Sequence, residues 1–198
     1  MRLIRSMAIA VVVYGAFAST ALAQTSQPSS SESKASTASQ AMAPTHTAPA
    51  AKPEDVSSPD AIVKALYDVI SGPAGTRDWD RFRSLFAPEG RLIPNGVKPT
   101  GEWAHTVLTV EDFVERAGNN MKKEGFFEHG ISNKVEQYGT IAHVFGTYES
   151  RHEKDGKPFA RGINSFSLAS DGKRWYVVQI LWQSETPTNP IPEKYLPK

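Results

Sequence analysis

The stretch from residue 126 to residue 185 constrains the fold more than any other part of this chain, because it reads as four long strands in succession. Residues 127–136 alternate between two sets of side chains, with the period of two that a half-buried strand shows. Three further strand-like runs follow with turn pairs between them: 141–153, 159–168 and 173–182, with Asp155-Gly156 and Asp171-Gly172 at two of the turns. The pattern predicts an antiparallel meander.

Composition limits the chain to one core and excludes several kinds of site. With 198 residues, 39% of them hydrophobic, and four Trp, the chain can bury one core and carry appendages. The absence of Cys excludes disulfides, thiolate metal sites, a Cys nucleophile and a lipid-modified Cys. The formal charge of +1 includes Arg2 and Arg5; without these two residues it is about −1, so no basic surface for nucleic acid is expected.

Residues 1–23 have the pattern of a secretory signal peptide. Arg2 and Arg5 precede an apolar run over residues 7–17, and Ala21-Leu22-Ala23 supplies an A-x-A cleavage pattern. The apolar run is shorter than the roughly 20 residues that span a bilayer. A membrane anchor is therefore the weaker reading, and we expect export, with a periplasmic or secreted mature chain that has no stable membrane insertion after cleavage.

The mature chain divides into a linker and a domain. Residues 24–56 are rich in Ser, Thr, Ala and Pro and lack apolar periodicity, which predicts a disordered linker. Residues 57–198 are predicted to fold as one domain. Its last residues, from Ser184 onwards, hold too many prolines for a helix or a central strand, so we expect an extended C-terminal arm that docks on its own domain or on a second copy.

Three helices are expected before the strands. Ser58 and Pro59 favour the start of a helix that ends near residue 71, residues 79–86 form a second helix, and a capping box that begins at Thr109 opens a third. In each of them the apolar residues recur at helical spacing. Between the second and third helices we expect a short strand at residues 91–93, and a loop over residues 97–106 that rims an opening.

The turns between the strands predict which side chains share a face. If Asp155-Gly156 is a two-residue loop, Asn164 lies opposite Thr147 and Phe166 lies opposite Phe145. The following turn is expected to bring Val178 near Asn164. The predicted inner face then gathers Phe145, Thr147, Asn164, Phe166, Val178, Ile180 and Trp182.

The first strand admits two registers, because Tyr138-Gly139 fits a two-residue or a three-residue loop, and a slip by one residue reverses both faces. Placing the apolar Ile131 inward puts His129 and Asn133 on the pocket face as well, with Glu149 near His129. An imidazole held by a carboxylate can act as a general base. A plain cross-strand polar pair is the alternative reading.

The three helices followed by the meander, with the runs Phe159-Ala-Arg-Gly-Ile-Asn-Ser-Phe166 and Asp171-Gly-Lys-Arg-Trp-Tyr-Val-Val178, resemble the nuclear transport factor 2-like superfamily and within it the exported SnoaL-like proteins. The resemblance covers roughly residues 59–185. It implies an α+β fold in which a curved antiparallel sheet wraps around three N-terminal helices and leaves a cone-shaped cavity.

The ketosteroid isomerases of that superfamily use a carboxylate base and an oxyanion hole made by a Tyr and an Asp. The resemblance places the base position at Pro94 or Asn95, neither of which can take a proton, and the oxyanion Asp position at Asn164, which can still donate a hydrogen bond. Tyr67 lies near the family's Tyr, and Trp182 lies where the family often has a cavity aromatic. The chain therefore departs from the isomerase pattern.

The sequence favours a binding domain for a small apolar or aromatic molecule, which would contact Tyr67 and the inner face, over an enzyme. A cofactor-independent isomerase, cyclase or hydrolase using His129, Glu149 and Asn164 is one alternative, and a non-catalytic homodimer through the sheet face is another. No cofactor is expected. No metal is expected either, because His129, His143 and His152 lack the spacing of known ligand motifs.

Overall fold

The computed structural model describes residues 49–98 and 100–198, and these form one compact unit. The predicted signal peptide and most of the predicted linker lie outside the described residues. Within the described part of the chain, no helix is both long and apolar enough to cross a membrane.

The folded domain begins before residue 57, where it was predicted to start. A 3₁₀ helix, η1, spans Pro53–Val56 and falls within the range predicted as linker. Asp55 accepts two hydrogen bonds from the guanidinium of Arg81, at 2.7 and 2.8 Å, and Val56 is buried in the core. Residues 53–56 therefore belong to the folded domain, because they contribute both an ion pair and apolar contact to it.

The three predicted helices are present. Helix α1 spans Pro59–Ile70, α2 spans Trp79–Ser84, and α3 spans Val110–Met121. Ser58 Oγ accepts a hydrogen bond from the amide of Ala61, and Thr109 and Asp112 form the predicted reciprocal capping box. The caps were predictable because they depend only on residues within one turn.

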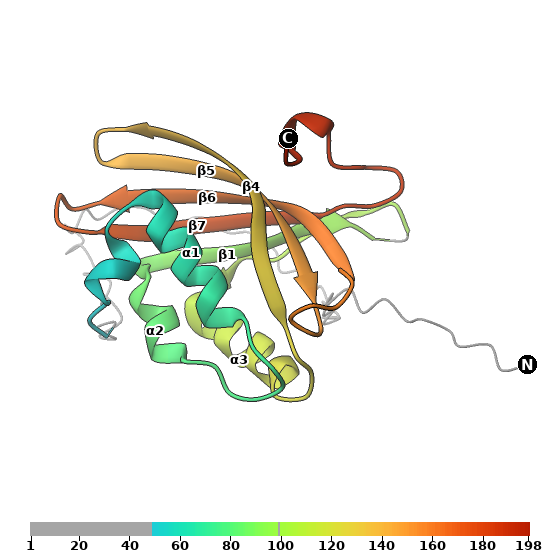
Figure 1. The fold of residues 1–198 in the computed structure, drawn as a ribbon, viewed down its shortest axis with the longest axis horizontal. Helices are drawn as coiled ribbons and strands as arrows, with labels where there is room; N and C mark the ends of the chain where they lie inside the picture. The colour runs from blue at the N-terminus through green and yellow to red at the C-terminus, as the bar shows by residue number, and fades with distance from the viewer. Residues whose placement is uncertain (1–48, 99) are drawn as a thin grey trace, which may run out of the picture. The chain divides into compact units, whose positions relative to one another are not determined.

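The strands form one mixed sheet rather than a purely antiparallel one. They are β1 (Phe86–Val97), β2 (Trp103–His105), β3 (Leu108–Thr109), β4 (Phe127–Tyr138), β5 (Ile141–Arg151), β6 (Ala160–Ser170) and β7 (Trp175–Ser184). Their order is β2-β1-β7-β6-β5-β4, with β3 also pairing to β1, and β1 runs parallel to β7 (Figure 1). The parallel pair follows from the crossover that carries the chain from β1 through α3 and the meander back to β7.

Strand β1 is much longer than the predicted 91–93. It continues through Pro94, and part of the predicted loop 97–106 pairs with it as β2. Pro94 lies between the residues of β1 that pair with β3 and those that pair with β2, so its missing N–H falls at a gap in that ladder. Its carbonyl still accepts a hydrogen bond from the amide of Thr106, at 3.2 Å.

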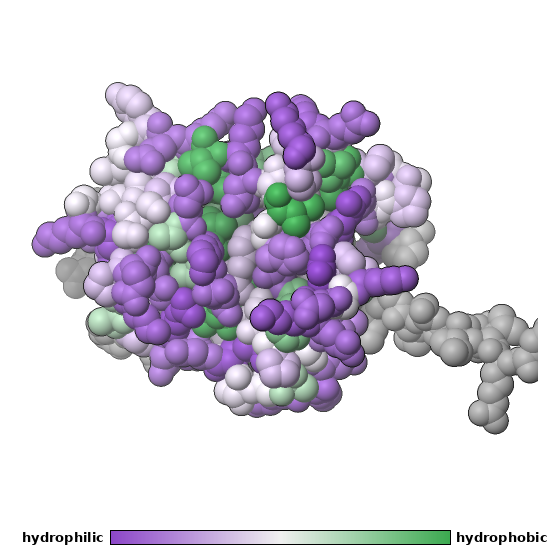
Figure 2. All heavy atoms as spheres, in the orientation of Figure 1, coloured by the Kyte–Doolittle hydropathy of each residue, from purple (hydrophilic) through white to green (hydrophobic). Residues whose placement is uncertain are grey.

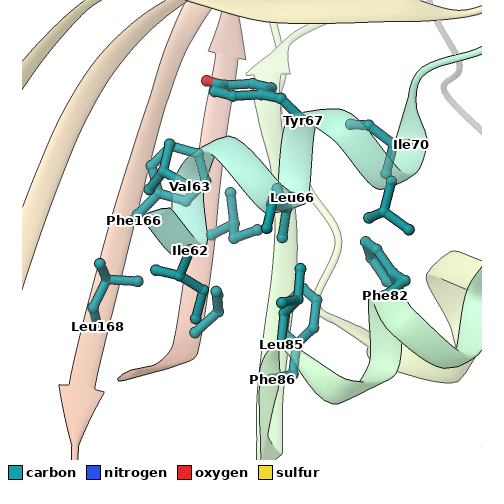
Figure 3. Packing of buried hydrophobic residues seen from close by; sticks show 14 of the residues in the cluster. Ile62, Val63, Leu66, Tyr67, Ile70, Phe82, Leu85, Phe86, Phe166 and Leu168 are labelled. Atoms are coloured by element: carbon teal, nitrogen blue, oxygen red, sulfur yellow. The ribbon is translucent and has the colours of Figure 1, made fainter. Parts of the chain in front are cut away.

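The core lies between the helices and one face of the sheet, which we call the inner face. The predicted stripe of α1 is buried, and Figure 3 shows Ile62, Val63 and Leu66 pointing toward Phe166 and Leu168 of β6 and the aromatic residues around α2. Phe82 is fully buried and stacks on Phe113 of α3, with ring centroids 5.3 Å apart. These contacts hold all three helices against the sheet.

The C-terminal arm docks on its own domain, across the opposite or outer face of the sheet. It begins after β7 and includes a second 3₁₀ helix, η2, at Glu193–Tyr195. Thr147 Oγ1 of β5 donates a hydrogen bond to the carbonyl of Tyr195 at 2.7 Å, and the rings of Phe145 and Tyr195 lie 5.1 Å apart. The arm therefore covers part of the face through which a dimer was predicted to form.

Candidate functional site

A β-bulge in β4 decides which side chains of this strand reach the inner face. Residues 127–130 pair with β5 in one register and residues 132–138 in the other, which leaves Ile131 as the extra residue. Glu128 lies opposite Ser150, and the bulge turns Glu128 inward, whereas simple alternation predicts it to point outward. Sequence reasoning missed this residue.

Glu128 belongs to a group of polar side chains that we call the inner polar cluster: Tyr67, Glu128, Tyr148, Ser150 and Asn164. Ser150 Oγ donates to Glu128 Oε2 at 2.6 Å, and Asn164 Nδ2 donates to the hydroxyl of Tyr67 at 3.1 Å and approaches Glu128 Oε1 at 3.5 Å. The hydroxyls of Tyr148 and Ser184 are 3.1 Å apart. The carboxyl of Glu128, the amide of Asn164, the hydroxyl of Ser150 and the phenol of Tyr67 are thus joined by hydrogen bonds, and the phenol of Tyr148 bonds to Ser184.

Burial sets the protonation of this cluster. It raises the pKa of the Glu128 carboxyl to about 7, against the opposing effect of hydrogen bonds from Ser150 and Asn164. Burial, together with the nearby charge of Glu128, also raises the pKa of Tyr67, and burial raises the pKa of Tyr148 to about 12. Near neutral pH both phenols keep their protons, while the carboxyl of Glu128 is present in both its charged and its uncharged form.

Glycines on the inner face make room for the cluster. A Cβ on Gly162 would lie 2.4 Å from the carbonyl oxygen of Gln183 and 2.5 Å from the hydroxyl of Tyr148. A Cβ on Gly130 would lie 3.2 Å from the ring of Tyr67. The two tyrosines therefore lie close against bare backbone, an approach that any larger residue would block.

Several predicted ligand contacts lie beside this cluster. Tyr67, Asn164, Phe166 and Ile180 are all buried, and Tyr67 and Phe166 meet edge to face at 6.1 Å. Figure 3 shows the hydroxyl of Tyr67 pointing away from the aliphatic residues of α1. Trp182 is half-buried, lies opposite Asn164, and meets Phe113 of α3 edge to face at 6.5 Å.

The predictions for Phe145, Thr147 and Val178 were wrong. The loop between β5 and β6 is longer than the two residues assumed, so Gly146 and not Thr147 lies opposite Asn164, and Val144 and not Phe145 lies opposite Phe166. The shift by one residue places Phe145 and Thr147 on the outer face, beneath the arm. The predicted register between β6 and β7 was wrong as well: Trp182 and not Val178 lies opposite Asn164, and a register shift leaves Val178 unpaired with β6 and exposed.

The predicted general base is also displaced. His129 and Glu149 are cross-strand neighbours, as expected, but they precede the bulge in β4 and share the outer face. His129 is exposed, and Glu149 accepts a hydrogen bond from Arg151 at 2.7 Å. Asn133, beyond the bulge, does lie on the inner face, over Gly146, although it is exposed at the end of the core.

The position that the resemblance assigns to the isomerase base, at Pro94 or Asn95, carries no carboxylate. Asn95 Nδ2 donates to Gln183 Oε1 at 3.2 Å, and Asn95 Oδ1 accepts from the indole of Trp103 at 2.6 Å. The only carboxyl in the inner polar cluster instead comes from β4. Gly130 was the one sequence signal for it, because a glycine inside an alternating strand often marks a bulge.

Two cavities in the described part of the structure lie away from the inner polar cluster. A cavity of about 250 Å³ lies between the outer face and the arm, and an open hollow of about 560 Å³ lies beside the start of β4. Their lining includes Phe145, Ile163, Leu181 and Ile191 for the first, and Pro73, Phe127, His152 and Lys154 for the second. Among the residues from 49 onwards that are described, no three His, Asp or Glu side chains gather to hold a metal ion.

No protein-family model matches the chain, and no curated protein matches it by sequence. Several solved structures are similar to about two thirds of the chain. An NTF2-like protein of unknown function from Silicibacter pomeroyi is 14% identical, with a TM-score of 0.45, over 64% of this chain and 92% of its own. A protein with a cystatin-like fold from Caulobacter vibrioides is 15% identical, with a TM-score of 0.48, over 65% and 88%.

A candidate ketosteroid isomerase from Parabacteroides distasonis is 14% identical, with a TM-score of 0.45, over 66% of this chain and 89% of its own. Each of these is a likeness in the path of the chain. The α+β arrangement of few helices against a large sheet is the one that the resemblance to the nuclear transport factor 2-like superfamily predicted.

Proposed function

We propose that this protein is an exported binding domain, and that its inner polar cluster holds the oxygen of a small apolar or aromatic molecule. The observation that supports this proposal is the hydrogen-bonded group of Tyr67 and Asn164, which are buried, and Glu128, which is half-buried. Buried polar groups cost stability compared with apolar packing, and they concentrate at sites that bind or react. If the only role of this region were to stabilise the fold, apolar side chains would be sufficient.

The hydrogen bonds of the cluster favour a particular kind of ligand. The hydroxyl oxygen of Tyr67 accepts a hydrogen bond from Asn164, which leaves its own hydrogen to donate. A carbonyl or hydroxyl oxygen of a ligand is a suitable acceptor, because the raised pKa of Tyr67 keeps that hydrogen in place. The apolar part of the ligand would lie against Phe166, Ile180 and Trp182.

Access requires side chains to move, because Tyr67 and Asn164 are only 6% and 5% exposed. Phe113 and Trp182 are half-buried and contact each other at the edge of the core, next to Asn164 in the neighbouring strand. Displacing these two rings would open a path between α3 and β7. Trp182 would therefore report binding through its fluorescence.

Native mass spectrometry of the protein released gently from its own periplasm tests the binding function. We expect a retained small molecule on the wild type, loss of that molecule in Tyr67→Phe and Asn164→Leu, and retention in Ser167→Ala, which alters the outer side of the same strand β6. Absence of any bound molecule from the wild type, or equal retention by all four proteins, would contradict the proposal.

A catalytic function is the second candidate, and the pKa of about 7 at Glu128 favours it. A carboxyl that titrates near neutral pH can take a proton from one atom and return it to another. In deuterium oxide, the wild type would then exchange an acidic C–H of the retained molecule for C–D. Glu128→Gln would bind the molecule without exchanging it, and equal exchange by both proteins would exclude Glu128 as the base.

Export is supported by the N-terminal pattern alone: Arg2 and Arg5, the apolar run 7–17 and Ala21-Leu22-Ala23. The intact mass of the protein from cells that express the whole chain tests it. We expect a mature chain that begins at Gln24 and lies outside the cytoplasm. A full-length mass in the cytoplasmic fraction would contradict this part of the proposal.

A further inference from the structure

The β4 edge of the sheet is open. In the strand order β4 is last, and β5 is its only neighbour among the described strands. After the bulge at Ile131, residues 132–138 pair with β5 without interruption up to a two-residue turn at Gly139 and Thr140. Figure 1 shows this hairpin at the upper left, at the margin of the sheet.

The backbone along this edge has hydrogen-bonding groups to offer. In a hairpin with a two-residue loop the closing pair, here Tyr138 and Ile141, exchanges hydrogen bonds, and the pairs alternate from there. Asn133, Val135 and Gln137 therefore direct their N–H and C=O groups away from β5. Such a row is a template for another strand.

We propose that two copies of this protein pair through β4, in antiparallel fashion, about a two-fold axis at Val135. In that register Val135 faces its own copy, and Asn133 faces Gln137 of the other chain, both as hydrogen-bonded pairs. Lys134 then lies opposite Glu136 in the close, non-hydrogen-bonded pairs on either side of the axis. One charge pair forms twice because the interface is symmetric.

The charges select this register against its neighbours. A two-fold axis at residue 134 would place Lys134 opposite Lys134, and an axis at residue 136 would place Glu136 opposite Glu136. Both arrangements keep the backbone hydrogen bonds, but each sets like charges directly opposite each other. A lone lysine on an edge strand disfavours pairing with another copy. Here Lys134 and Glu136 together form a charge pattern that is complementary to the same pattern in the second copy.

Exposed apolar side chains at the same hairpin support the inference. Val135, Tyr138 and Ile141 are 39%, 85% and 60% exposed, and Figure 2 shows hydrophobic residues interrupting the hydrophilic surface over β4 and β5. Pairing would cover Val135 and place Tyr138 beside Ser132 of the other chain. No proline lies within β4, and no bulge follows Ile131, so the edge has neither of these protective devices.

The dimer should be weak. One pair of short strands buries less than the 1,200 Å² or so of a standard interface, so we expect a dissociation constant on the order of micromolar or weaker. Its strength should fall at high salt, because the two charge pairs are exposed.

Sedimentation velocity of the mature chain, residues 24–198, tests the proposal over a range of protein and salt concentrations. Lys134→Glu and Glu136→Lys each place like charges in both pairs, and we expect each to weaken the dimer about tenfold or more. The double variant Lys134→Glu with Glu136→Lys restores opposite charges and should restore the dimer. Lys123→Glu, just beyond the C-terminal end of α3, changes the charge equally and should have no effect.

Val135→Pro supplies an independent check, because it removes the N–H at the axis while an edge strand tolerates proline. We expect it to abolish the dimer with an unchanged circular dichroism spectrum. A wild type that stays monomeric at all concentrations overturns the proposal. A dimer that the single charge variants and Val135→Pro leave unchanged also overturns it, because that dimer would use another surface.

Discussion

Glu128 links the inner polar cluster to pH. The pKa of its carboxyl is about 7 in the folded protein, compared with 4.5 for a glutamate exposed to water, as in the unfolded chain. Between these values the unfolded chain loses the proton and the folded protein keeps it, so the free energy of unfolding falls as pH rises through this window. A pKa shift of this size contributes about 3 kcal/mol to the free energy of unfolding at low pH, and this contribution is lost above pH 7.

We therefore predict that Glu128→Gln, which cannot titrate, gains stability relative to the wild type as pH rises from 4.5 to 7.5. Urea unfolding of both proteins at several pH values measures the difference. The difference should be small at pH 4.5 and approach about 3 kcal/mol above pH 7. Parallel stability curves for the two proteins would show that the carboxyl is not held in its neutral form.

At the scale of single residues, the sequence predicted what depends on near neighbours. Ser58 and Thr109 cap their helices as expected, because each cap involves only the next turn. Asn164 was identified through the family resemblance, and it does contact Tyr67. Glu128 was missed, because its inward direction depends on a bulge that alternation cannot reveal.

At the scale of elements, the connection between α1 and α2 depends on one side chain. Arg77 is buried, and its guanidinium donates hydrogen bonds to the carbonyls of Ile70, Gly72, Pro73 and Gly75, at 2.8 to 3.1 Å. The carbonyl of Ile70 lies at the end of α1, where helical carbonyls lack partners. The guanidinium therefore ends one helix and shapes the loop that leads to the next.

Lysine cannot reproduce this arrangement, because an ammonium has three donors and no fixed fork. We predict that Arg77→Lys lowers the free energy of unfolding by about 2–3 kcal/mol, since it leaves buried carbonyls unpaired. Arg116→Lys, on the exposed side of α3, is a suitable control and should change stability by less than about 0.5 kcal/mol. Equal values for the two variants would mean that water replaces the lost bonds.

The elements themselves were predicted better than their registers. All four strands of the meander and all three helices exist, because their side-chain periods are strong. The register between β5 and β6 was wrong by one residue, because the turn at Asp155 and Gly156 belongs to a longer loop. That single error moved Phe145 and Thr147 to the wrong face, and no local pattern could have corrected it.

At the scale of the whole domain, the arm is the feature that the sequence left open. Prolines predicted that it is extended, but not which surface it covers. Its place follows from long-range contacts: Thr147 with Tyr195, and a bidentate ion pair of Arg161 with Glu185, whose carboxylate also accepts the amide of Ile191. The cavity of about 250 Å³ beneath the arm shows that it bridges the face without filling it.

Removal of the arm should expose apolar residues of the outer face and so promote self-association of the protein. A chain that ends at Thr186 exposes Phe145, Ile163 and Leu181 together, as well as Thr147, which is fully buried in the intact protein. We predict little change in the free energy of unfolding, because the lost apolar contacts are offset by the conformational entropy of the released residues. Self-association should increase instead, since contiguous exposed apolar surface promotes pairing.

Sedimentation velocity of this truncated chain, alone and combined with Lys134→Glu, distinguishes the two surfaces. Association through the outer face should persist in the combined variant, whereas pairing through β4 should be lost. Tyr195→Ala in the intact chain removes only the ring that contacts Phe145. Self-association of this variant should be stronger than that of the intact protein and weaker than that of the truncated one. If truncation leaves self-association unchanged, the arm has no shielding role, and the outer face is inert without it.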